Sequence, residues 1–229
     1  MITSRTVKLG IADDHVLFRN GVIKLIESYT EDTARYYPTV EAASGEELLD
    51  SIQNLPDREK PDIILIDLNM PQMDGFQTIP KLRQLYPAVV IIVLTMRDDD
   101  DAIIRSLKLG ASGFLTKNIE KKELKEAIDS CLEKGYYYPG HLTKRLVHNI
   151  TYDFTKEPET ASSDIVLSEK EKEFIRLACT DLTYAEIALK MELSPRTVDG
   201  YRNTLFAKTH VASRVGLAMW AIRNRIVHP

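Results

Sequence analysis

One stretch of the sequence constrains the fold more than any other, because an apolar run, a carboxylate and a turn follow one another directly. Residues 62–66 are almost entirely apolar and end at Asp67, after which Met70-Pro71 and Asp74-Gly75 indicate a turn. A short apolar run of this kind is typical of a strand buried on both faces of a parallel sheet. Asp74 can cap the helix that follows. Asp67 could be an ordinary turn-forming residue. In a central strand, however, it would stand at the edge where open α/β sheets bind their ligands.

The rest of the first 135 residues alternates between strand-like and helix-like patterns. Apolar strands are predicted at residues 6–12, 62–66, 89–95 and 111–116, with a short edge strand at 39–43 after a polar loop at 30–38. Amphipathic helices are predicted at residues 15–29, from 44 onward, and at 76–85, 98–109 and 120–134. Such alternation implies a parallel sheet with helices on both faces. The expected fold over residues 1–135 is α/β, a flavodoxin-like, doubly wound sheet of about five strands.

Most of these strands end in polar side chains: Asp13 and Asp14 follow the first, Asp67 the third, Thr95 ends the fourth and Lys117 follows the fifth. Taken singly, each could be a cap or a solvated strand end. The carboxyl ends of parallel strands meet in one crevice, however, so we expect these groups to lie together. Converging carboxylates repel one another unless a cation joins them, and oxygen ligands suit Mg²⁺. Asp67 would then be a nucleophile toward phosphorus, while Lys117 and Thr95 bind the phosphoryl oxygens. We expect no histidine at these strand ends.

The charge of the chain is divided unevenly, although the whole carries a net −4. Residues 1–150 and 151–164 carry −4 and −3, whereas residues 165–229 carry +3, so a polyanionic partner is expected at the carboxyl-terminal part. That part has only helical periodicity, with helices predicted at residues 168–179, 183–191, 195–208 and 213–226. Ser194-Pro195 is typical of a helix start, and two short helices joined by a tight turn indicate a helix-turn-helix. We therefore expect a linker over residues 136–165, with a helix at 141–149, and a small all-α four-helix domain over 166–229.

The strand-end groups and the helix-turn-helix together resemble a known family. The first part resembles the receiver domain of bacterial two-component response regulators through Asp13-Asp14, Asp67 with Met70-Pro71 and Asp74-Gly75, Thr95, and Lys117 preceded by Gly113-Phe114. The second part resembles the LuxR-type helix-turn-helix through residues 167–173, Ile187-Ala188, residues 194–198 and Ser213-Arg214. The whole is similar to the NarL/FixJ subfamily. The resemblance implies a DNA-binding transcriptional response regulator, in which phosphorylation controls dimerisation and DNA binding.

The resemblance also implies a role for each receiver residue. Asp67 would accept a phosphoryl group from a sensor histidine kinase. Mg²⁺ would be held by Asp13, Asp14, Asp67 and the backbone carbonyl of Asn69. Thr95 and Phe114 would form a switch pair, in which the hydroxyl moves to the phosphoryl group and the aromatic ring turns inward. The chain departs from the family at Asn118, where proline often follows the lysine; this puts a cis peptide bond in doubt.

In a helix-turn-helix the second helix enters the major groove, with its first residues against base edges. The residues expected to face the groove floor are Thr197, Asp199, Gly200 and Asn203. Those expected mainly at phosphates are Arg196, Tyr201, Arg202 and Lys208, and Thr183 and Ser194 complete the candidate set. Val198, Leu205 and Phe206 would pack inward. The family commonly has Lys in place of Asp199 and His in place of Tyr201. Asp199 could accept a hydrogen bond from a cytosine amino group or simply complement the helix dipole.

Two other functions fit parts of the sequence. A magnesium-dependent phosphatase or phosphotransferase of haloacid dehalogenase type also uses a strand-end Asp, but it needs a second Asp two residues later, where this chain has Asn69. A pure protein-interaction module is the second alternative, and salt-sensitive binding to duplex DNA would distinguish it. We expect the chain not to be a turnover enzyme. The apolar residues of the final helix, within residues 215–222, could form a dimer interface or could pack only into the core of their own domain.

The sequence also indicates the cellular compartment of the protein. Cys131 and Cys179 lie far apart within helical patterns, which indicates unpaired thiols in a reducing compartment. The amino terminus lacks the apolar core of a signal peptide, and no apolar run approaches the length that spans a bilayer. We therefore expect a cytoplasmic protein with no membrane partner and a phosphorylation-linked homodimer.

Overall fold

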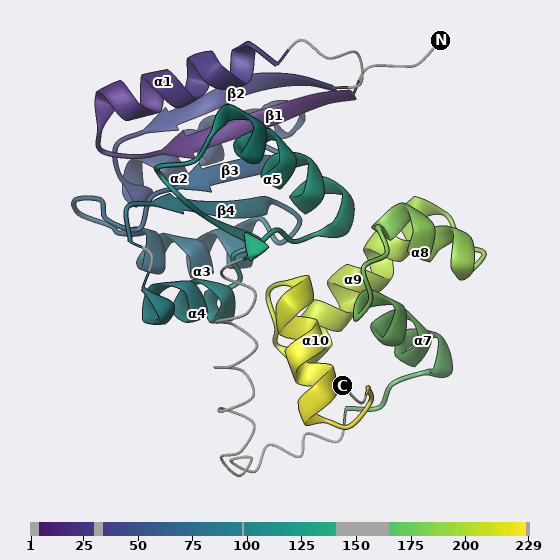
Figure 1. The fold of residues 1–229 in the computed structure, drawn as a ribbon. Coiled ribbons are helices and arrows are strands. Elements are labelled where there is room, and N and C mark those ends of the chain that lie inside the picture. Colours follow the sequence, from purple (N-terminus) through teal and green to yellow (C-terminus); the bar gives the residue numbers. More distant parts are fainter. Residues whose placement is uncertain (1–4, 30–33, 98, 141–164, 228–229) are drawn as a thin grey trace.

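The computed structural model describes residues 5–29, 34–97, 99–140 and 165–227, and it contains an α/β domain and a helical domain (Figure 1). Five parallel strands form one sheet in the order β2-β1-β3-β4-β5. The strands are β1 (Arg5–Ala12), β2 (Ala34–Ala42), β3 (Ile63–Ile66), β4 (Val90–Thr95) and β5 (Gly113–Thr116). The connecting helices are α1 (Val16–Glu27), α2 (Gly45–Asn54), α3 (Gly75–Leu85), α4 (Asp100–Leu109) and α5 (Lys121–Lys134), with a 3-10 turn at Asp57–Glu59. The predicted doubly wound, flavodoxin-like fold is confirmed.

The sheet is buried on both faces, and alternate residues of each strand supply the two faces. In β3, Ile64 and Ile66 pack with α2, α3 and α4, whereas Ile63 and Leu65 pack with α1 and α5. All four side chains have no exposed surface. This explains why the strand reads as an uninterrupted apolar run: neither face is left to water.

The turn after β3 is fixed by Asp74 and Gly75. The Asp74 carboxylate accepts a hydrogen bond from the Gln77 backbone N–H, and the Gln77 side-chain oxygen accepts one from the Asp74 backbone N–H, so the start of α3 has a capping box. A Cβ atom at Gly75 would collide with the backbone carbonyl oxygen of Asp67. Only glycine therefore allows α3 to begin this close to the strand end that carries Asp67.

The sequence prediction was wrong for the second strand, since residues 34–38, expected in a loop, belong to β2. Pro38 lies opposite Leu9 of β1, next to a shift in register between Leu9 and Gly10. β2 is an edge strand of the sheet. A proline has no N–H to give to a ladder, but an edge strand pairs on one side only and tolerates it.

The helical domain comprises α7 (Glu169–Ala178), α8 (Tyr184–Lys190), α9 (Pro195–Thr209) and α10 (Arg214–Arg223). Ser168 and Thr183 begin α7 and α8 with capping boxes, and Ser194 caps α9 with Pro195 at its first position. The four predicted helices are confirmed, although α10 ends three residues earlier than expected. The expected helix at residues 141–149 lies outside the described residues. Cys131 and Cys179 are unpaired thiols, and no helix of the described parts could cross a membrane.

Candidate functional site

The strand-end carboxylates and the lysine gather at one edge of the sheet. Lys117, just after β5, places its Nζ 2.7 Å from Oδ2 of Asp13 and 2.6 Å from Oδ2 of Asp67. Asp13 and Asp67 are 2% and 3% exposed, so both charges are almost fully removed from water. Two buried carboxylates this close need a cation, and here the ammonium group joins them. The placement expected from the ends of β1, β3 and β5 is therefore observed.

The environment of Lys117 keeps it protonated. Burial acts to lower its pKa, but the hydrogen bonds to Asp13 and Asp67 and the charges of these carboxylates act in the other direction, and the net result is a raised pKa. The ring of Phe18 in α1 lies 4.8 Å from Nζ and covers another side of the cation. A fixed positive charge thus lies directly beside the Asp67 carboxylate.

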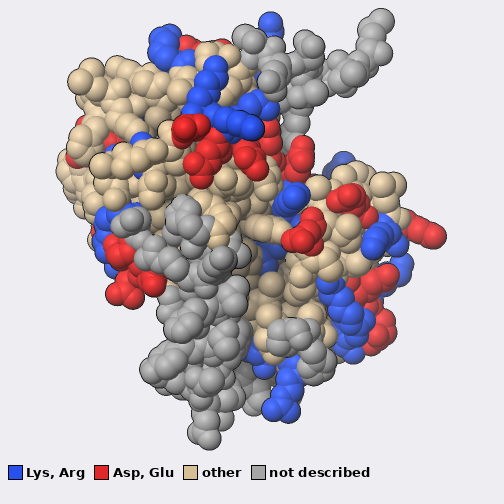
Figure 2. All heavy atoms as spheres, in the orientation of Figure 1, with Lys and Arg blue, Asp and Glu red and all other residues tan. Residues whose placement is uncertain are grey.

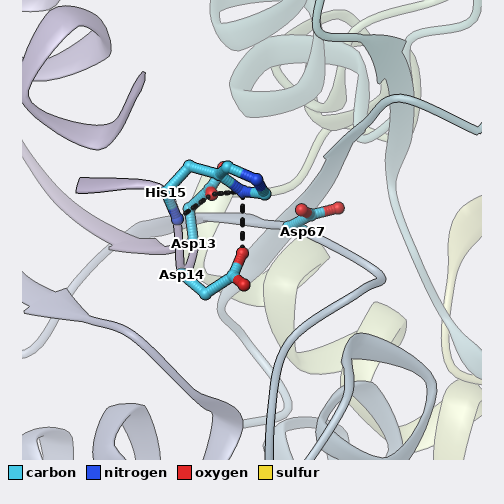
Figure 3. Close-up of side chains that lie close together, drawn as sticks. All are labelled: Asp13, Asp14, His15 and Asp67. Atoms are coloured by element: carbon cyan, nitrogen blue, oxygen red, sulfur yellow. Dashed lines mark hydrogen bonds and ion pairs between the residues drawn. The ribbon is translucent and has the colours of Figure 1, made fainter. Parts of the chain in front are cut away.

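A histidine also lies in this pocket, contrary to the sequence expectation. His15 Nδ1 lies 2.8 Å from Oδ1 of Asp14 and 3.3 Å from Oδ1 of Asp13 (Figure 3). The backbone N–H of His15 donates to Asp13 Oδ1 at 2.9 Å. The sequence signal for this contact is the position of His15 directly after Asp13 and Asp14.

The pocket has the donors that a divalent cation requires. One ligand atom from each of Asp13, Asp14, His15 and Asp67 lies within 4.8 Å of the others. Carboxylate oxygens are the ligands that Mg²⁺ prefers, and Asp14, the more exposed of the pair, leaves one side of the pocket open to water. The Asn69 backbone N–H donates to Asp67 Oδ1 at 3.3 Å, so the backbone of Asn69 lies beside the carboxylate. The acidic cluster is therefore consistent with Mg²⁺ binding.

Thr95 and Phe114 lie at the ends of the adjacent strands. Thr95 is fully buried, and its hydroxyl accepts a hydrogen bond from the Arg97 backbone N–H at 3.4 Å. Phe114 is fully buried in the core formed with α2, α3 and α4. The Phe114 ring therefore points into the core of the α/β domain in this structure. Among the described residues no peptide bond is cis, so the residue after Lys117 adds no such turn.

The predicted DNA-contact residues surround the exposed side of α9 and its amino-terminal turn. Seven of them are exposed: Ser194, Arg196, Thr197, Asp199, Gly200, Asn203 and Lys208. Ser194 and Thr183 are the N-caps of α9 and α8. Val198 and Leu205 pack inward as predicted, whereas Phe206 is only partly buried against the same core. Two side chains are also engaged within the domain: Lys208 pairs with Glu171 at 2.6 Å, and Tyr201 stacks on Phe174 with ring centroids 6.2 Å apart.

Arg214 joins the helical domain to the end of α5, a contact that the sequence did not reveal. Its guanidinium is 2% exposed and donates to the carbonyl oxygens of Ala178, Thr180 and Lys134 at 2.8, 2.9 and 2.6 Å. The first two belong to the helical domain and the third to the last residue of α5. The rings of Tyr136 and Tyr184 lie 5.6 and 5.1 Å from its guanidinium carbon. One buried cation therefore links the two domains.

Further contacts surround this link. The Tyr136 hydroxyl donates to Asp181 at 2.9 Å, from the segment after α5 to the loop before α8. Val215 of α10 packs against the core formed by α2, α3 and α4. The Tyr184 ring lies against Gly135, which has a φ of +84° and leaves no room for a side chain. The domains thus touch through specific polar and apolar contacts.

Part of the predicted DNA-binding face is turned toward the α/β domain. A cavity of about 690 Å³ separates the two, and its walls include Thr183, Asp199 and Arg202 on one side and Asp62 and Tyr86 on the other. Arg202 pairs with Asp199 at 3.1 Å and lies over the Tyr184 ring. These side chains therefore face the α/β domain across the cavity. Figure 2 shows both charge signs mixed on the visible face of the helical domain.

A family model agrees with the fold and the pocket. The response regulator receiver domain model matches residues 9–129, more than half of the chain. The chain belongs to the response regulator family. The model for bacterial regulatory proteins of the LuxR family matches residues 165–221, which include α7–α10 up to Ala221. The predicted NarL/FixJ-type combination is confirmed, and the chain is a transcriptional response regulator.

Relatives of this response regulator are similar over nearly their full length. The transcriptional regulatory protein DegU of Brevibacillus brevis is 27% identical over 238 residues, which cover 97% of this chain and 96% of that protein. The nitrate/nitrite response regulator protein NarL of Escherichia coli K12 is 29% identical over 217 residues, covering 94% and 95%. A LuxR-family two-component response regulator from Aurantimonas sp. SI85-9A1 has a solved structure with a TM-score of 0.56 and 26% identity, covering 64% of this chain and 99% of that one.

Proposed function

We propose that Asp67 accepts a phosphoryl group from a sensor histidine kinase, and that this modification controls DNA binding and dimerisation. The observation that carries the proposal is the burial of Asp67 beside Asp13 and the ammonium group of Lys117. In the transfer, an Asp67 carboxylate oxygen forms a bond to phosphorus while the bond from phosphorus to the kinase histidine nitrogen breaks. The electron pair of that bond leaves with the imidazole.

The residues of this chain supply positioning and charge. Lys117 holds one Asp67 oxygen and donates to the phosphoryl oxygens, and the Thr95 hydroxyl lies at the neighbouring strand end for a further hydrogen bond. Mg²⁺, when held by Asp13, Asp14, Asp67 and the Asn69 carbonyl, supplies neutralisation of the charge on the transferred group. We infer no turnover of substrates, because the pocket serves a modification of its own side chain.

Control over DNA binding is proposed from the domain contacts. Asp199 and Arg202 line the cavity that faces the α/β domain, so α9 enters a major groove only after the domains separate. The proposed DNA contacts are the ten residues of the helix-turn-helix named above, and the proposed boundaries are 1–135, 136–165 and 166–229. Dimerisation would pair two recognition helices on neighbouring half-sites.

The experiment is phosphorylation of full-length protein with acetyl phosphate, with Asp67→Asn compared against Asp74→Asn. Asp74 lies in the same turn, and Asn retains its capping role, so Asp74→Asn is expected to label as the wild type does. Asp67→Asn is expected not to label. Phosphorylated wild type should then bind duplex DNA more tightly than unlabelled protein, with affinity that falls as salt rises. Acid-stable labelling that persists in Asp67→Asn contradicts the assignment.

A further inference from the structure

The cavity between the two domains lies at the opposite edge of the sheet from the pocket that contains Asp67. Its walls include Asp62 and Val90, at the amino ends of β3 and β4, whereas Asp67 follows the carboxyl end of β3. Asp62 and Asp67 flank the four residues of β3, which puts them roughly 16 Å apart. The cavity volume of about 690 Å³ is typical of sites for small organic molecules, which often form between domains. A molecule bound here would occupy space separate from the phosphorylation pocket.

Each domain contributes a cation that lies over a tyrosine ring to the walls of this cavity. In the α/β domain, Lys60 Nζ lies 5.3 Å from the centre of the Tyr86 ring. In the helical domain, the guanidinium carbon of Arg202 lies 5.3 Å from the centre of the Tyr184 ring. Such a pair offers a positive charge and a flat apolar surface together. The two walls thus have the same chemistry, although they come from different domains.

The carboxylates that pair with these cations are far more exposed than the cations themselves. Lys60 Nζ lies 2.6 Å from Asp57, whose side chain is 95% exposed, whereas that of Lys60 is 28% exposed. Arg202 lies 3.1 Å from Asp199, and the exposed fractions are 18% and 54%. Ion pairs with exposed carboxylates contribute little, because water competes for the carboxylate. An anion inside the cavity could therefore replace either partner.

A buried guanidinium behind the cavity wall adds positive charge. Arg83 donates to the carbonyl oxygens of Pro87 and Val89, both of which line the cavity. It also donates to the Ser112 hydroxyl, and none of these acceptors is charged. Burial lowers the pKa of Arg83 to about 10, and the charge of Arg202 acts in the same direction. The like charges of Arg83 and Arg202 therefore repel each other, and a bound anion would relieve this repulsion.

The other acidic side chains of the cavity do not cancel this charge. Asp62 accepts a hydrogen bond from the Lys8 backbone N–H at 2.8 Å and lies 3.8 Å from Lys8 Nζ, so a cation of its own compensates it. Glu133 is exposed, so water and salt screen its charge. The charge left near the two tyrosine rings is therefore positive.

We propose that this cavity binds a small planar aromatic anion, such as an aromatic carboxylate, which bridges the two domains. Lys60 and Arg202 would attract the anionic group, and the rings of Tyr86 and Tyr184 would contact the aromatic part. The inference goes beyond the proposed function and does not depend on phosphorylation. Because Arg202 is also a proposed DNA contact, the bound anion and a DNA phosphate would compete for its guanidinium.

The test is isothermal titration calorimetry of full-length protein with three probes that share an indole ring and differ in charge. Indole-3-acetate is an anion, indole-3-acetamide is neutral and tryptamine is a cation. Indole-3-acetate is expected to bind at one site with a dissociation constant below about 1 mM, as its size allows. It should bind at least about tenfold more tightly than the amide or tryptamine, because the cavity supplies cations as partners.

Three variants locate the site. Lys60→Gln and Arg202→Gln each remove one cation from one domain, and each should weaken indole-3-acetate binding at least about fivefold. Lys172→Gln is the matched control: Lys172 pairs with Glu169 three residues before it, as Lys60 does with its own partner, but it lies in α7 and is not among the lining residues. The control should bind indole-3-acetate as the wild type does.

Four results would overturn the proposal. One is the absence of indole-3-acetate binding up to about 10 mM. Another is equal or tighter binding of the amide or tryptamine, because the cavity would then not select negative charge. An equal loss in Lys172→Gln would show that binding follows only the net charge of the protein. A loss in only one of Lys60→Gln and Arg202→Gln would place the anion on one domain, where it does not bridge the two.

Discussion

Replacing Tyr136 by Phe should loosen the contact between the two domains without disturbing either core. The change removes the hydrogen bond from the Tyr136 hydroxyl to Asp181 and leaves the ring beside Arg214. A hydrogen bond of this kind contributes roughly 0.5–1.5 kcal/mol net. Because Asp181 is exposed and can be hydrated once the hydroxyl is gone, the lower part of that range applies, about 0.5–1 kcal/mol.

This free energy converts directly into DNA affinity if the domains must separate before α9 binds. The apparent dissociation constant is the intrinsic constant divided by the binding-competent fraction. Weakening the closed arrangement by about 0.5–1 kcal/mol raises a small competent fraction about two- to fivefold. Unphosphorylated Tyr136→Phe is therefore expected to bind fluorescent duplex DNA about two- to fivefold more tightly than wild type in anisotropy titrations.

Three comparisons make the result specific. Asp181→Ala should give a similar gain, and the double variant should gain no more than either single change, because both remove one hydrogen bond. Tyr138→Phe is the matched control, since its hydroxyl donates to Ala111 within the α/β domain; it should leave DNA affinity unchanged. Equal affinities of wild type, Tyr136→Phe and Asp181→Ala would refute the claim that this contact restrains the recognition helix.

The further predictions concern the ion pairs of Lys117 and Glu171. Lys117→Met leaves Asp13 and Asp67 buried without their cation, so we expect a loss of about 3 kcal/mol or more in unfolding free energy in chelator, measured by urea denaturation, and a partial recovery in Mg²⁺. The pKa of Lys117 is raised, so the stabilisation of the fold by its charge is complete below the ordinary lysine value of 10.5 and is lost as pH rises through the folded-state pKa. The difference in unfolding free energy between wild type and Lys117→Met should therefore shrink above pH 10.5. A difference that widens there would contradict the ion-pair account. Glu171→Gln removes the pairing with Lys208, which is 40% exposed, so a loss of about 1 kcal/mol is expected at neutral pH. The pKa of Glu171 is lowered from its ordinary value of 4.5, chiefly by its hydrogen bond to Lys208. The loss should therefore shrink as pH falls below 4.5 and vanish as pH falls through the folded-state pKa, and a loss that stays constant throughout acid titration would exclude the charge as its cause.

The amino-acid sequence determined the features that depend on local pattern. The alternation of apolar strands with amphipathic helices predicted the doubly wound sheet, since each strand is buried on both faces and each helix on one. The carboxyl ends of parallel strands must meet at one edge of the sheet, so the proximity of Asp13, Asp67 and Lys117 could be predicted from the sequence. Capping residues such as Ser194 located the helix-turn-helix, because caps satisfy backbone groups within a few residues of themselves.

Tertiary structure alone decided what depends on long-range geometry. Pro38 reads as a loop residue in sequence, yet it lies in β2, because an edge strand need not use both sides of its backbone. The contact of Arg214 with the carbonyl of Lys134 joins residues 80 apart. That link depends on how two separately folded domains pack, and their surface charges and rings leave no periodic trace in the sequence.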